Sequence, residues 1–328
     1  MLVVSLGTTG GWRVAAAELV GSLERAGASV ALVQPGPARR MRTFALTDLA
    51  QALATRAVAR RGIAAHRPAA VVYCSVTASL LWPARGTIWL DAVAAENRPG
   101  RHGVWQRPVE RRRIAGALVV MTMGERALDR LGPGFREPVL VPVPVEPSWT
   151  GPARPPAERD LAAITYAGDP AKKRLDAVLS AWDAARGDGE TLVVAGTDTI
   201  RSRPGVEVVG RLAPGEYRAL LRRARIFVAA PTREDYGIAP LEALADGCML
   251  VSTPAPGPYP ALRLARALDP RLVSDDLRGP IRIALDQPDE AYAIRALELL
   301  APFRRAAVDR TIADEVLPRL LPGRRRGD

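Results

Sequence analysis

Two glutamates in the second half of the chain have a spacing that suits sugar recognition. In the stretch PTREDYGIAPLEALADGCMLV, Glu234 and Glu242 are separated by seven residues, and Tyr236 and Gly237 lie between them. A carboxylate can accept hydrogen bonds from two neighbouring hydroxyls. Glu242 therefore suits the vicinal hydroxyls of a ribose, and Glu234 suits those of a second sugar. Ordinary surface charge is the alternative interpretation of both residues.

The same stretch is expected to place the start of a helix beside these glutamates. A short helix is predicted from about Ile238 to Asp246, with Pro240 tolerated in its first turn and Gly247 placed to end it. A buried strand, IFVAAP, precedes it, so the helix N-terminus faces the edge of the sheet where ligands bind in such folds. The amides of Gly237 and Ile238 could then bind phosphate or sugar oxygens.

The only two lysines of the chain, Lys172 and Lys173, lie side by side after a glycine loop, in AGDPAKKRLD. Arginine supplies every other positive side chain among the 46 basic residues. Lysine is a compact point charge on a flexible stem and binds phosphate at helix N-termini. We expect this loop, with Gly168, to bind phosphate, and we keep chance placement as the alternative.

A second glycine-rich turn, GTTGG, follows the first expected strand. Its last residues, Gly10 and Gly11, could hold an anion at the start of the next helix. As a dinucleotide fingerprint the stretch is poor, because it lacks the G-x-G-x-x-G spacing and no acidic residue ends the second strand. A plain strand-to-helix turn explains it equally well.

Short apolar runs alternate with Ala- and Leu-rich helical stretches along the whole chain. The expected strands are Leu2–Leu6, ASVALVQ, PAAVVYC, GTIWLDA, ALVVMT and VLVPVPV in the first half, and LAAITYAG, TLVVAG, VEVVG and IFVAAP in the second. Such alternation indicates βαβ units and parallel sheets. We therefore predict two Rossmann-like, doubly wound α/β domains that face a cleft.

The Pro- and Gly-rich stretch EPSWTGPARPPAE separates the two series of strands. We predict an N-terminal acceptor-binding domain over 1–145, a linker over 146–158 and a C-terminal domain over 159–302. A final helix with a basic tail is expected over 303–328, and we expect that helix to pack back on the N-terminal domain.

The net charge of +11 is concentrated in the first half of the chain. Residues 1–150 have 19 arginines and 10 acidic residues, a net charge of +9, whereas the rest has a net charge of +2. The first half is therefore expected to meet an anionic partner. No reader motif for nucleic acid accompanies the charge, so we do not expect nucleic acid as the partner. No apolar run is long enough to cross a bilayer, and the opening MLVVSLG lacks the basic region of a signal peptide.

The second half resembles a known enzyme family. The pattern E-x-Y-G-x-x-x-x-E-A-L-A-x-G is similar to the donor-site motif of retaining GT-B glycosyltransferases of the family 4 type. YAGDPAKKRLDAVLSAW and VEVVGRLAPGEYRALLRRARIFVAAPTRE resemble the segments that precede that motif. The resemblance implies a GT-B fold and a hexosyltransferase-type enzyme. Such an enzyme transfers a sugar with retention and without a metal ion or cofactor, here from a UDP- or GDP-sugar.

The resemblance also implies roles for particular residues. Lys173 would contact the leaving diphosphate, Glu242 the ribose and Glu234 the donor sugar. The further donor-binding residues implied are Gly10, Gly11, Gly168, Lys172, Gly210, Arg211, Tyr236, Gly237 and Ile238.

Two positions depart from the family pattern. Asp169 stands where an arginine often follows the loop glycine, and Asp91 stands where many members have a histidine. Asp91 is a candidate for binding an acceptor hydroxyl or for assisting proton transfer, and a strand-end cap is its alternative role. His102, in the polar loop ENRPGRHG, is a second candidate acceptor contact.

The acceptor is expected to be anionic or lipid-linked. Arginines border an Ala- and Leu-rich helix in the first half, at positions 39, 40, 42, 56, 60 and 61, and three more lie at 111–113. Coding bias is an equally good explanation for them. We expect a cytoplasmic protein and leave open a peripheral contact with the anionic inner face of the membrane. The alternative functions are a catalytically silent GT-B protein that binds anionic partners, and a GT-B sugar-nucleotide epimerase.

Overall fold

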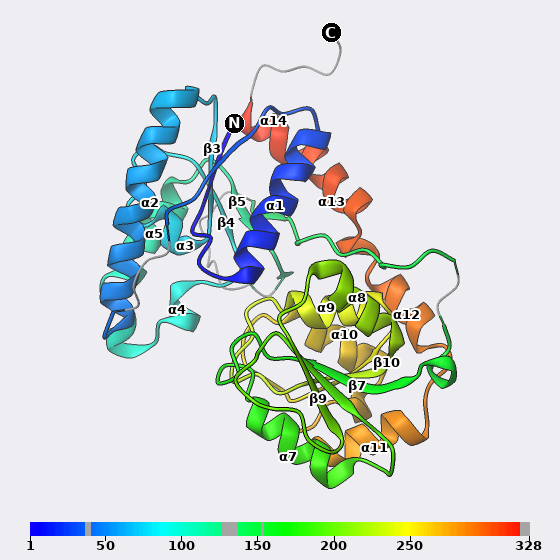
Figure 1. Cartoon of the computed structure of the whole chain (residues 1–328). Coiled ribbons are helices and arrows are strands. Elements are labelled where there is room, and N and C mark those ends of the chain that lie inside the picture. The colour runs from blue at the N-terminus through cyan, green and yellow to red at the C-terminus, as the bar shows by residue number, and fades with distance from the viewer. Residues whose placement is uncertain (37–40, 126, 128–136, 152–153, 322–328) are drawn as a thin grey trace. The chain divides into compact units, whose positions relative to one another are not determined.

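The computed structural model describes residues 1–36, 41–125, 127, 137–151 and 154–321. The chain divides into two compact units. The first consists of Met1–Pro144 and the segment that begins at Arg305, and the second is Val145–Arg304 (Figure 1). Arg39 and Arg40, noted in the sequence, lie outside the described residues. None of the helices in the described part of the chain combines the length and hydropathy that a membrane-spanning segment needs.

A fully parallel sheet forms the centre of the first unit, with strand order β2-β1-β3-β4-β5-β6. Its strands are β1 (Leu2–Ser5), β2 (Ala31–Val33), β3 (Val71–Cys74), β4 (Thr87–Leu90), β5 (Val120–Thr122) and β6 (Val139–Leu140). Strands β1, β3, β4 and β5 are buried throughout, because helices cover both faces of such a sheet.

The helices of the first unit follow the strands as the alternating pattern predicts. They are α1 (Gly10–Arg25), α2 (Phe44–His66), α3 (Val76–Ser79), α4 (Ala94–Asn97), the 3₁₀ turn η1 (Gly100–Gly103) and α5 (Gln106–Gly116). The N-caps of α1 and α2 are Thr9 and Thr43, and the side chain of each accepts a hydrogen bond from a backbone N–H in the first turn.

Strand β6 is shorter than the sequence predicts. The run VLVPVPV was expected to be a strand over its whole length, but the strand ends at Leu140. Pro142 and Pro144 have no N–H to donate to a neighbouring strand, so the ladder cannot continue through them. Val141 still donates a hydrogen bond to Thr122 O, at 2.8 Å, and its own carbonyl accepts one from the indole of Trp89.

The second unit is built around another parallel sheet, with strand order β11-β10-β7-β8-β9. Its strands are β7 (Leu161–Tyr166), β8 (Leu192–Ala195), β9 (Val206–Gly210), β10 (Ala224–Ala229) and β11 (Met249–Ser252). Its helices are α7 (Leu175–Ala185), α8 (Pro214–Arg223), α9 (Ile238–Ala245), α10 (Pro260–Leu268), α11 (Arg278–Asp286) and α12 (Tyr292–Leu299), with 3₁₀ turns η2 (Pro156–Glu158), η3 (Pro270–Leu272) and η4 (Ala301–Phe303).

The chain returns to the first unit near its end. There it forms α13 (Arg305–Thr311), the π-helical turn η5 (Ile312–Val316) and α14 (Leu317–Leu320). Ion pairs join this segment to α1: Arg305 contacts Glu18 at 2.5 Å, and Asp309 contacts Arg25 at 2.6 Å. The Pro- and Gly-rich stretch 146–158 lies within the second unit.

Helix α2 packs on the sheet through small residues. Ala52, Ala59 and Gly62, spaced at helical intervals, are buried on one side of it. A Cβ atom added to Gly62 would lie 3.1 Å from the methyl groups of Leu2 and from Val33. Close approach of this helix to β1 and β2 therefore depends on the absence of side-chain volume at that position.

Replacing Gly62 with valine should destabilise the first unit. Overpacking of this kind lowers the free energy of unfolding by about 1–3 kcal/mol, and a thermal melt followed by circular dichroism would measure it. Ala57→Val, on the exposed side of the same helix, shows what valine costs in this helix without overpacking, although glycine to valine improves helix propensity and alanine to valine lowers it. Equal melting temperatures for the two variants would contradict the packing described here.

Candidate functional site

Glu234 is held in the loop between β10 and α9 by its own backbone. Its N–H donates to Pro256 O at 3.0 Å, and its carbonyl accepts from the N–H of Tyr259 at 3.3 Å. A Cβ atom at Gly257, where φ is +115°, would lie 2.1 Å from Glu234 O. Glycine at 257 is therefore required for the two loops to meet. The Glu234 side chain is buried, with 6% of the residue exposed.

The carboxylate of Glu234 pairs with the two lysines. Lys173 Nζ donates a hydrogen bond to Glu234 Oε2, and Lys172 Nζ lies 3.9 Å from Glu234 Oε1. Lys172 O also accepts from the N–H of Thr232 at 2.9 Å, which ties the lysine loop to the glutamate loop. The structure thus brings together residues that are 61 positions apart in the chain.

Asp169 is turned toward its own loop. Its Oδ1 accepts from the backbone N–H of Lys172 at 3.1 Å, and its carbonyl accepts from the N–H of Lys173 at 2.9 Å. The carboxylate therefore stabilises the turn that carries the lysines, which explains an acidic residue beside two cations.

Helix α9 begins beside this ion pair. Gly237 precedes it with φ +82°, and a Cβ atom there would lie 2.9 Å from the ring of Tyr259 and 3.1 Å from Glu234 Cγ. The N–H groups at the start of α9 have no partner within the helix, so they can bind an anion or a polar oxygen. A small pocket formed by the second unit reaches this point, and Tyr166, Lys173, Glu234, Pro240 and Tyr259 are among its lining residues.

Glu242 lies one turn into α9, beside the partly buried Arg218. Arg218 Nη1 is 3.7 Å from Glu242 Oε1, and Arg218 Nε donates to Asp246 Oδ2 at 2.5 Å. Arg218 also donates to Glu146 O, and Ser148 donates to Asp246, so this cluster reaches the start of the second unit. Burial raises the pKa of Glu242 to about 7, with Asp246 adding to the rise and Arg218 opposing it.

The ends of β7, β8 and β9 form the remainder of the site. A Cβ atom at Gly168 would lie 2.8 Å from the Tyr166 hydroxyl, and one at Gly196 would lie 2.8 Å from the Tyr166 ring, so glycine at both positions leaves room for this side chain. Gly210 has φ +67° with open space beside it, and Arg211 is exposed. Tyr236, also predicted, is buried.

Sequence reasoning did not single out Arg218, Asp246, Tyr259 or Gly257. The stretch APGPYPAL, residues 255–262, supports Glu234 through backbone contacts, and such contacts have no residue signature. Arg218 is one of many arginines in the sequence, so its type carried no signal.

The four remaining predicted residues belong to the first unit. Gly10 and Gly11 form the exposed first turn of α1, after the N-cap Thr9. Asp91 follows β4, and its Oδ1 accepts from the N–H of Ala92 at 2.8 Å. His102 is exposed on η1 and meets the ring of Phe44 edge to face.

Replacing Glu242 with glutamine should stabilise the second unit at high pH. As the pH rises past 4.5 the unfolded chain releases this proton while the folded chain still holds it, so the folded state loses stability until about pH 7. The glutamine variant has no titrating carboxyl group at position 242, so its stability does not fall in this way. It should be more stable than wild type at pH 8 by roughly 1–3 kcal/mol, with little difference near pH 4.5. Thermal melts at both pH values test this, with Glu290→Gln as the exposed control, and a difference that does not change with pH would contradict it.

Part of the chain matches a known protein family. Residues 162–275 match the family described as Glycosyl transferases group 1. This range contains the lysine loop, Arg218, α9 and the supporting stretch around Tyr259. None of the curated proteins matches the sequence significantly.

Solved structures show which fold the two units have. The chain is similar to WaaG, a glycosyltransferase involved in lipopolysaccharide biosynthesis, with 15% identity, a TM-score of 0.69, and 96% of this chain and 99% of that chain covered. It is also similar to HepE from Anabaena, solved in complex with UDP-glucose, with 12% identity, a TM-score of 0.67, and 96% of this chain and 98% of that chain covered. A third similar structure is sucrose-phosphate synthase from Thermosynechococcus elongatus, with 14% identity, a TM-score of 0.63, and 94% of this chain and 95% of that chain covered. The fold is therefore GT-B, and together with the family match it supports a glycosyltransferase.

Proposed function

We propose that this protein is a retaining, metal-independent glycosyltransferase that transfers a sugar from a UDP- or GDP-sugar to an anionic or lipid-linked acceptor. The observation that carries the proposal is the meeting of Lys173, Glu234 and the N-terminus of α9 at the carboxyl edge of one sheet, with Glu242 one turn further along.

Each group in this arrangement suits one part of a nucleotide-sugar. Lys173 and the amides of Gly237 and Ile238 are positive groups for the diphosphate. Glu242, beside Arg218, can accept hydrogen bonds from both ribose hydroxyls. Glu234 can accept from hydroxyls of the donor sugar. Lys172 and Lys173 together bring two positive charges to the single negative charge of Glu234, so the loop keeps a net positive charge for the phosphates.

The proposed chemistry relies on charge stabilisation. As the bond between the anomeric carbon and the diphosphate oxygen breaks, negative charge grows on the leaving group, and Lys173 is positioned to stabilise it. The acceptor oxygen bonds to the anomeric carbon from the same face, and its proton passes to the departing phosphate oxygen. The UDP-glucose in the HepE structure favours a UDP-sugar as the first donor to test.

The acceptor is proposed to bind the first unit. Asp91 and His102 both follow β4, at the carboxyl edge where ligands bind in parallel sheets. Asp91 could bind an acceptor hydroxyl and assist its proton transfer. Gly10 and Gly11, at the start of α1, are proposed to contact the distal phosphate.

A thermal melt with UDP, GDP and ADP tests the donor site. A nucleotide at about 100 times its dissociation constant stabilises the folded state by roughly 2.7 kcal/mol, so one of the three should raise the melting temperature by several degrees. Lys173→Ala should reduce that shift strongly, because the variant lacks the ammonium group nearest the phosphates.

Two controls make the result specific. Arg201→Ala removes an exposed cation from the same unit and should leave the shift unchanged. Lys173→Arg keeps the charge and the pairing of Glu234, and should restore part of the shift if charge is what matters. Absence of a shift with all three nucleotides would sink the transferase proposal and favour a silent GT-B protein that binds anionic partners.

A further inference from the structure

Helix α2 of the first unit has leucines on its exposed side. Small residues face the sheet, as described above, whereas Leu46, Leu49, Leu53, Ala57, Arg60 and Ala64 form a continuous exposed stripe at intervals of three or four residues. Leu53 is 52% exposed. In a helix that only covers a sheet, the large apolar residues belong on the packed side. Here the arrangement is reversed, so the exposed side has a purpose other than packing on the sheet.

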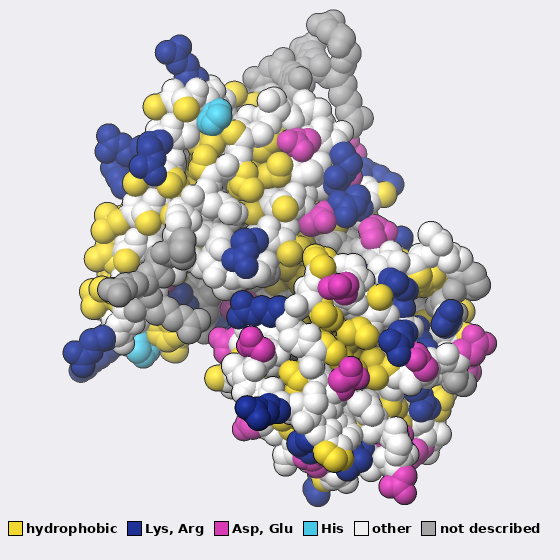
Figure 2. Space-filling model, in the orientation of Figure 1, with side chains coloured by type: hydrophobic (Ala, Val, Ile, Leu, Met, Phe, Trp, Pro, Cys, Tyr) yellow, Lys and Arg dark blue, Asp and Glu magenta, His cyan; other side chains and the backbone are white. Residues whose placement is uncertain are grey.

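More apolar side chains extend this stripe at the start of the helix. Met41 and Phe44 are exposed there, and Phe44 is 56% exposed. Figure 2 shows hydrophobic side chains along the margin of the molecule where Figure 1 places α2, with basic side chains beside them. We call this surface the α2 face: Met41, Arg42, Phe44, Leu46, Leu49, Leu53, Arg60 and Arg61.

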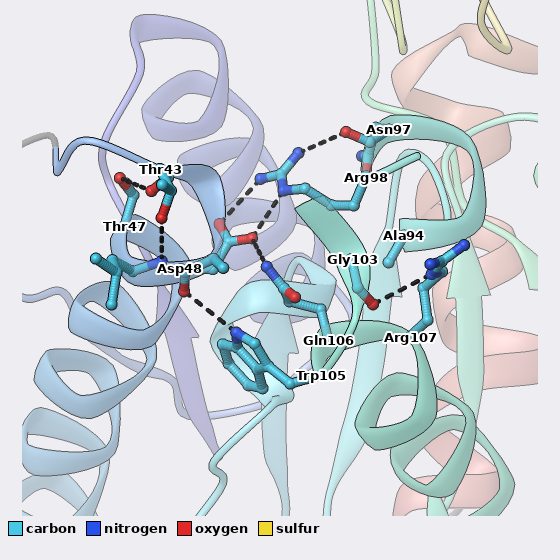
Figure 3. A network of polar contacts seen from close by, with 12 residues as sticks. Thr43, Thr47, Asp48, Ala94, Asn97, Arg98, Gly103, Trp105, Gln106 and Arg107 are labelled. Carbon is cyan, nitrogen blue, oxygen red and sulfur yellow. Dashed lines mark hydrogen bonds and ion pairs between the residues drawn. The ribbon is translucent and has the colours of Figure 1, made fainter. Parts of the chain in front are cut away.

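A buried polar network fixes the start of the α2 face. Asp48, 2% exposed, accepts two hydrogen bonds from Arg98, at 2.7 and 3.0 Å, and one from Gln106 at 3.0 Å (Figure 3). The Arg98 guanidinium lies over the Phe44 ring, 5.1 Å from its centroid, and Trp105 donates to Ala45 O. Phe44 is thus exposed but held in place, which is a property of a docking surface rather than of a fraying helix end.

The exposed charged side chains of helices α2 and α5 are all basic. Helices α2 and α5 contain two carboxylates, Asp48 and Glu110, and both are buried: Asp48 pairs with Arg98, and Glu110 accepts from the N–H of Ala94. Within the part of the chain that the structure describes, Arg42, Arg60 and Arg61 have no ion-pair partner.

We propose that the α2 face docks on the surface of an anionic lipid bilayer. Leucine, methionine and phenylalanine would enter the boundary between headgroups and acyl chains, while Arg42, Arg60 and Arg61 would contact lipid phosphates. A second copy of the chain fits less well, because pairing through the same face would bring its unpaired arginines together. A nucleic acid would leave the exposed leucines without a role, since leucine has no ring on which a base could stack.

The position of the face also suits an enzyme that acts on a membrane-bound molecule. In a parallel α/β unit, helices run opposite to the strands, so the apolar N-terminal half of α2 lies at the carboxyl edge of the sheet. The Asp48–Arg98 pair joins it there to the segment after β4. All residues of the α2 face belong to the first unit, so the docking proposal does not depend on the donor site.

Sedimentation with lipid vesicles tests the proposal. Wild-type protein should pellet with vesicles of equal parts phosphatidylglycerol and phosphatidylcholine, and not with phosphatidylcholine alone. Each arginine near an anionic surface contributes about 1 kcal/mol, so Arg60→Gln with Arg61→Gln should lower the partition coefficient about 30-fold. Leu46→Gln, Leu49→Gln and Leu53→Gln combined should lower it at least 10-fold, and should abolish the binding that persists at high salt.

Matched variants in the second unit separate this face from general charge and hydrophobicity. Arg201→Gln with Arg266→Gln removes the same charge, and Ile294→Gln with Leu299→Gln removes exposed apolar surface; both should bind like wild type. Glutamine is a good helix former, and thermal melts would verify that each variant is folded. The proposal fails if wild type does not pellet with anionic vesicles, if the leucine variant binds like wild type, or if the two arginine variants lose binding equally. It also fails if the leucine substitutions change the oligomeric state instead of vesicle binding.

Discussion

The ion pair between Lys173 and Glu234 is the contact around which the second unit organises its site. A carboxylate as buried as Glu234 needs a partner, because an unpaired charge away from water is strongly unfavourable. The lysine loop supplies that partner from the neighbouring strand, and Asp169 and Thr232 hold the loop in the shape that makes this contact. A basic group and a carboxylate are thereby fixed together at the start of α9, which is the arrangement on which the proposed function rests.

Backbone contacts and glycine positions hold Glu234 in place for its pair with Lys173. Glycine at 237 and 257 lets the loop of Glu234 and the loop of Tyr259 approach within contact distance, and the Tyr259 ring lies beside the residue that precedes α9. Further along the helix, Arg218 balances two carboxylates, Glu242 and Asp246. Arg218 also donates to Glu146 O and Ser148 donates to Asp246, so this group of residues reaches the start of the second unit. Hydrogen bonds therefore connect the residues around Glu242 to the first residues of the second unit.

The first unit uses a buried ion pair in another way. Asp48 and Arg98 fix the N-terminal end of α2 against the segment after β4 (Figure 3). Replacing such a pair with apolar residues is often neutral for stability, so its value lies in position. It keeps Phe44 and the neighbouring leucines exposed in one place, and it turns the only acidic residue of that helix inward.

The sequence by itself determined the alternation of strands and helices, because this depends on local apolar periodicity and on the positions of glycine and proline along the chain. The GT-B fold was implied by the resemblance of its motifs to a known family, and the similarity to solved structures confirms it. The sequence could not show that Asp169 faces its own loop, that Arg218 lies beside Glu242, or that β6 ends before its prolines. The exposed leucines of α2 illustrate the limit. From composition they look like core residues, and only tertiary packing decides that Ala52, Ala59 and Gly62 face the sheet instead, because the helix approaches β1 too closely for larger side chains.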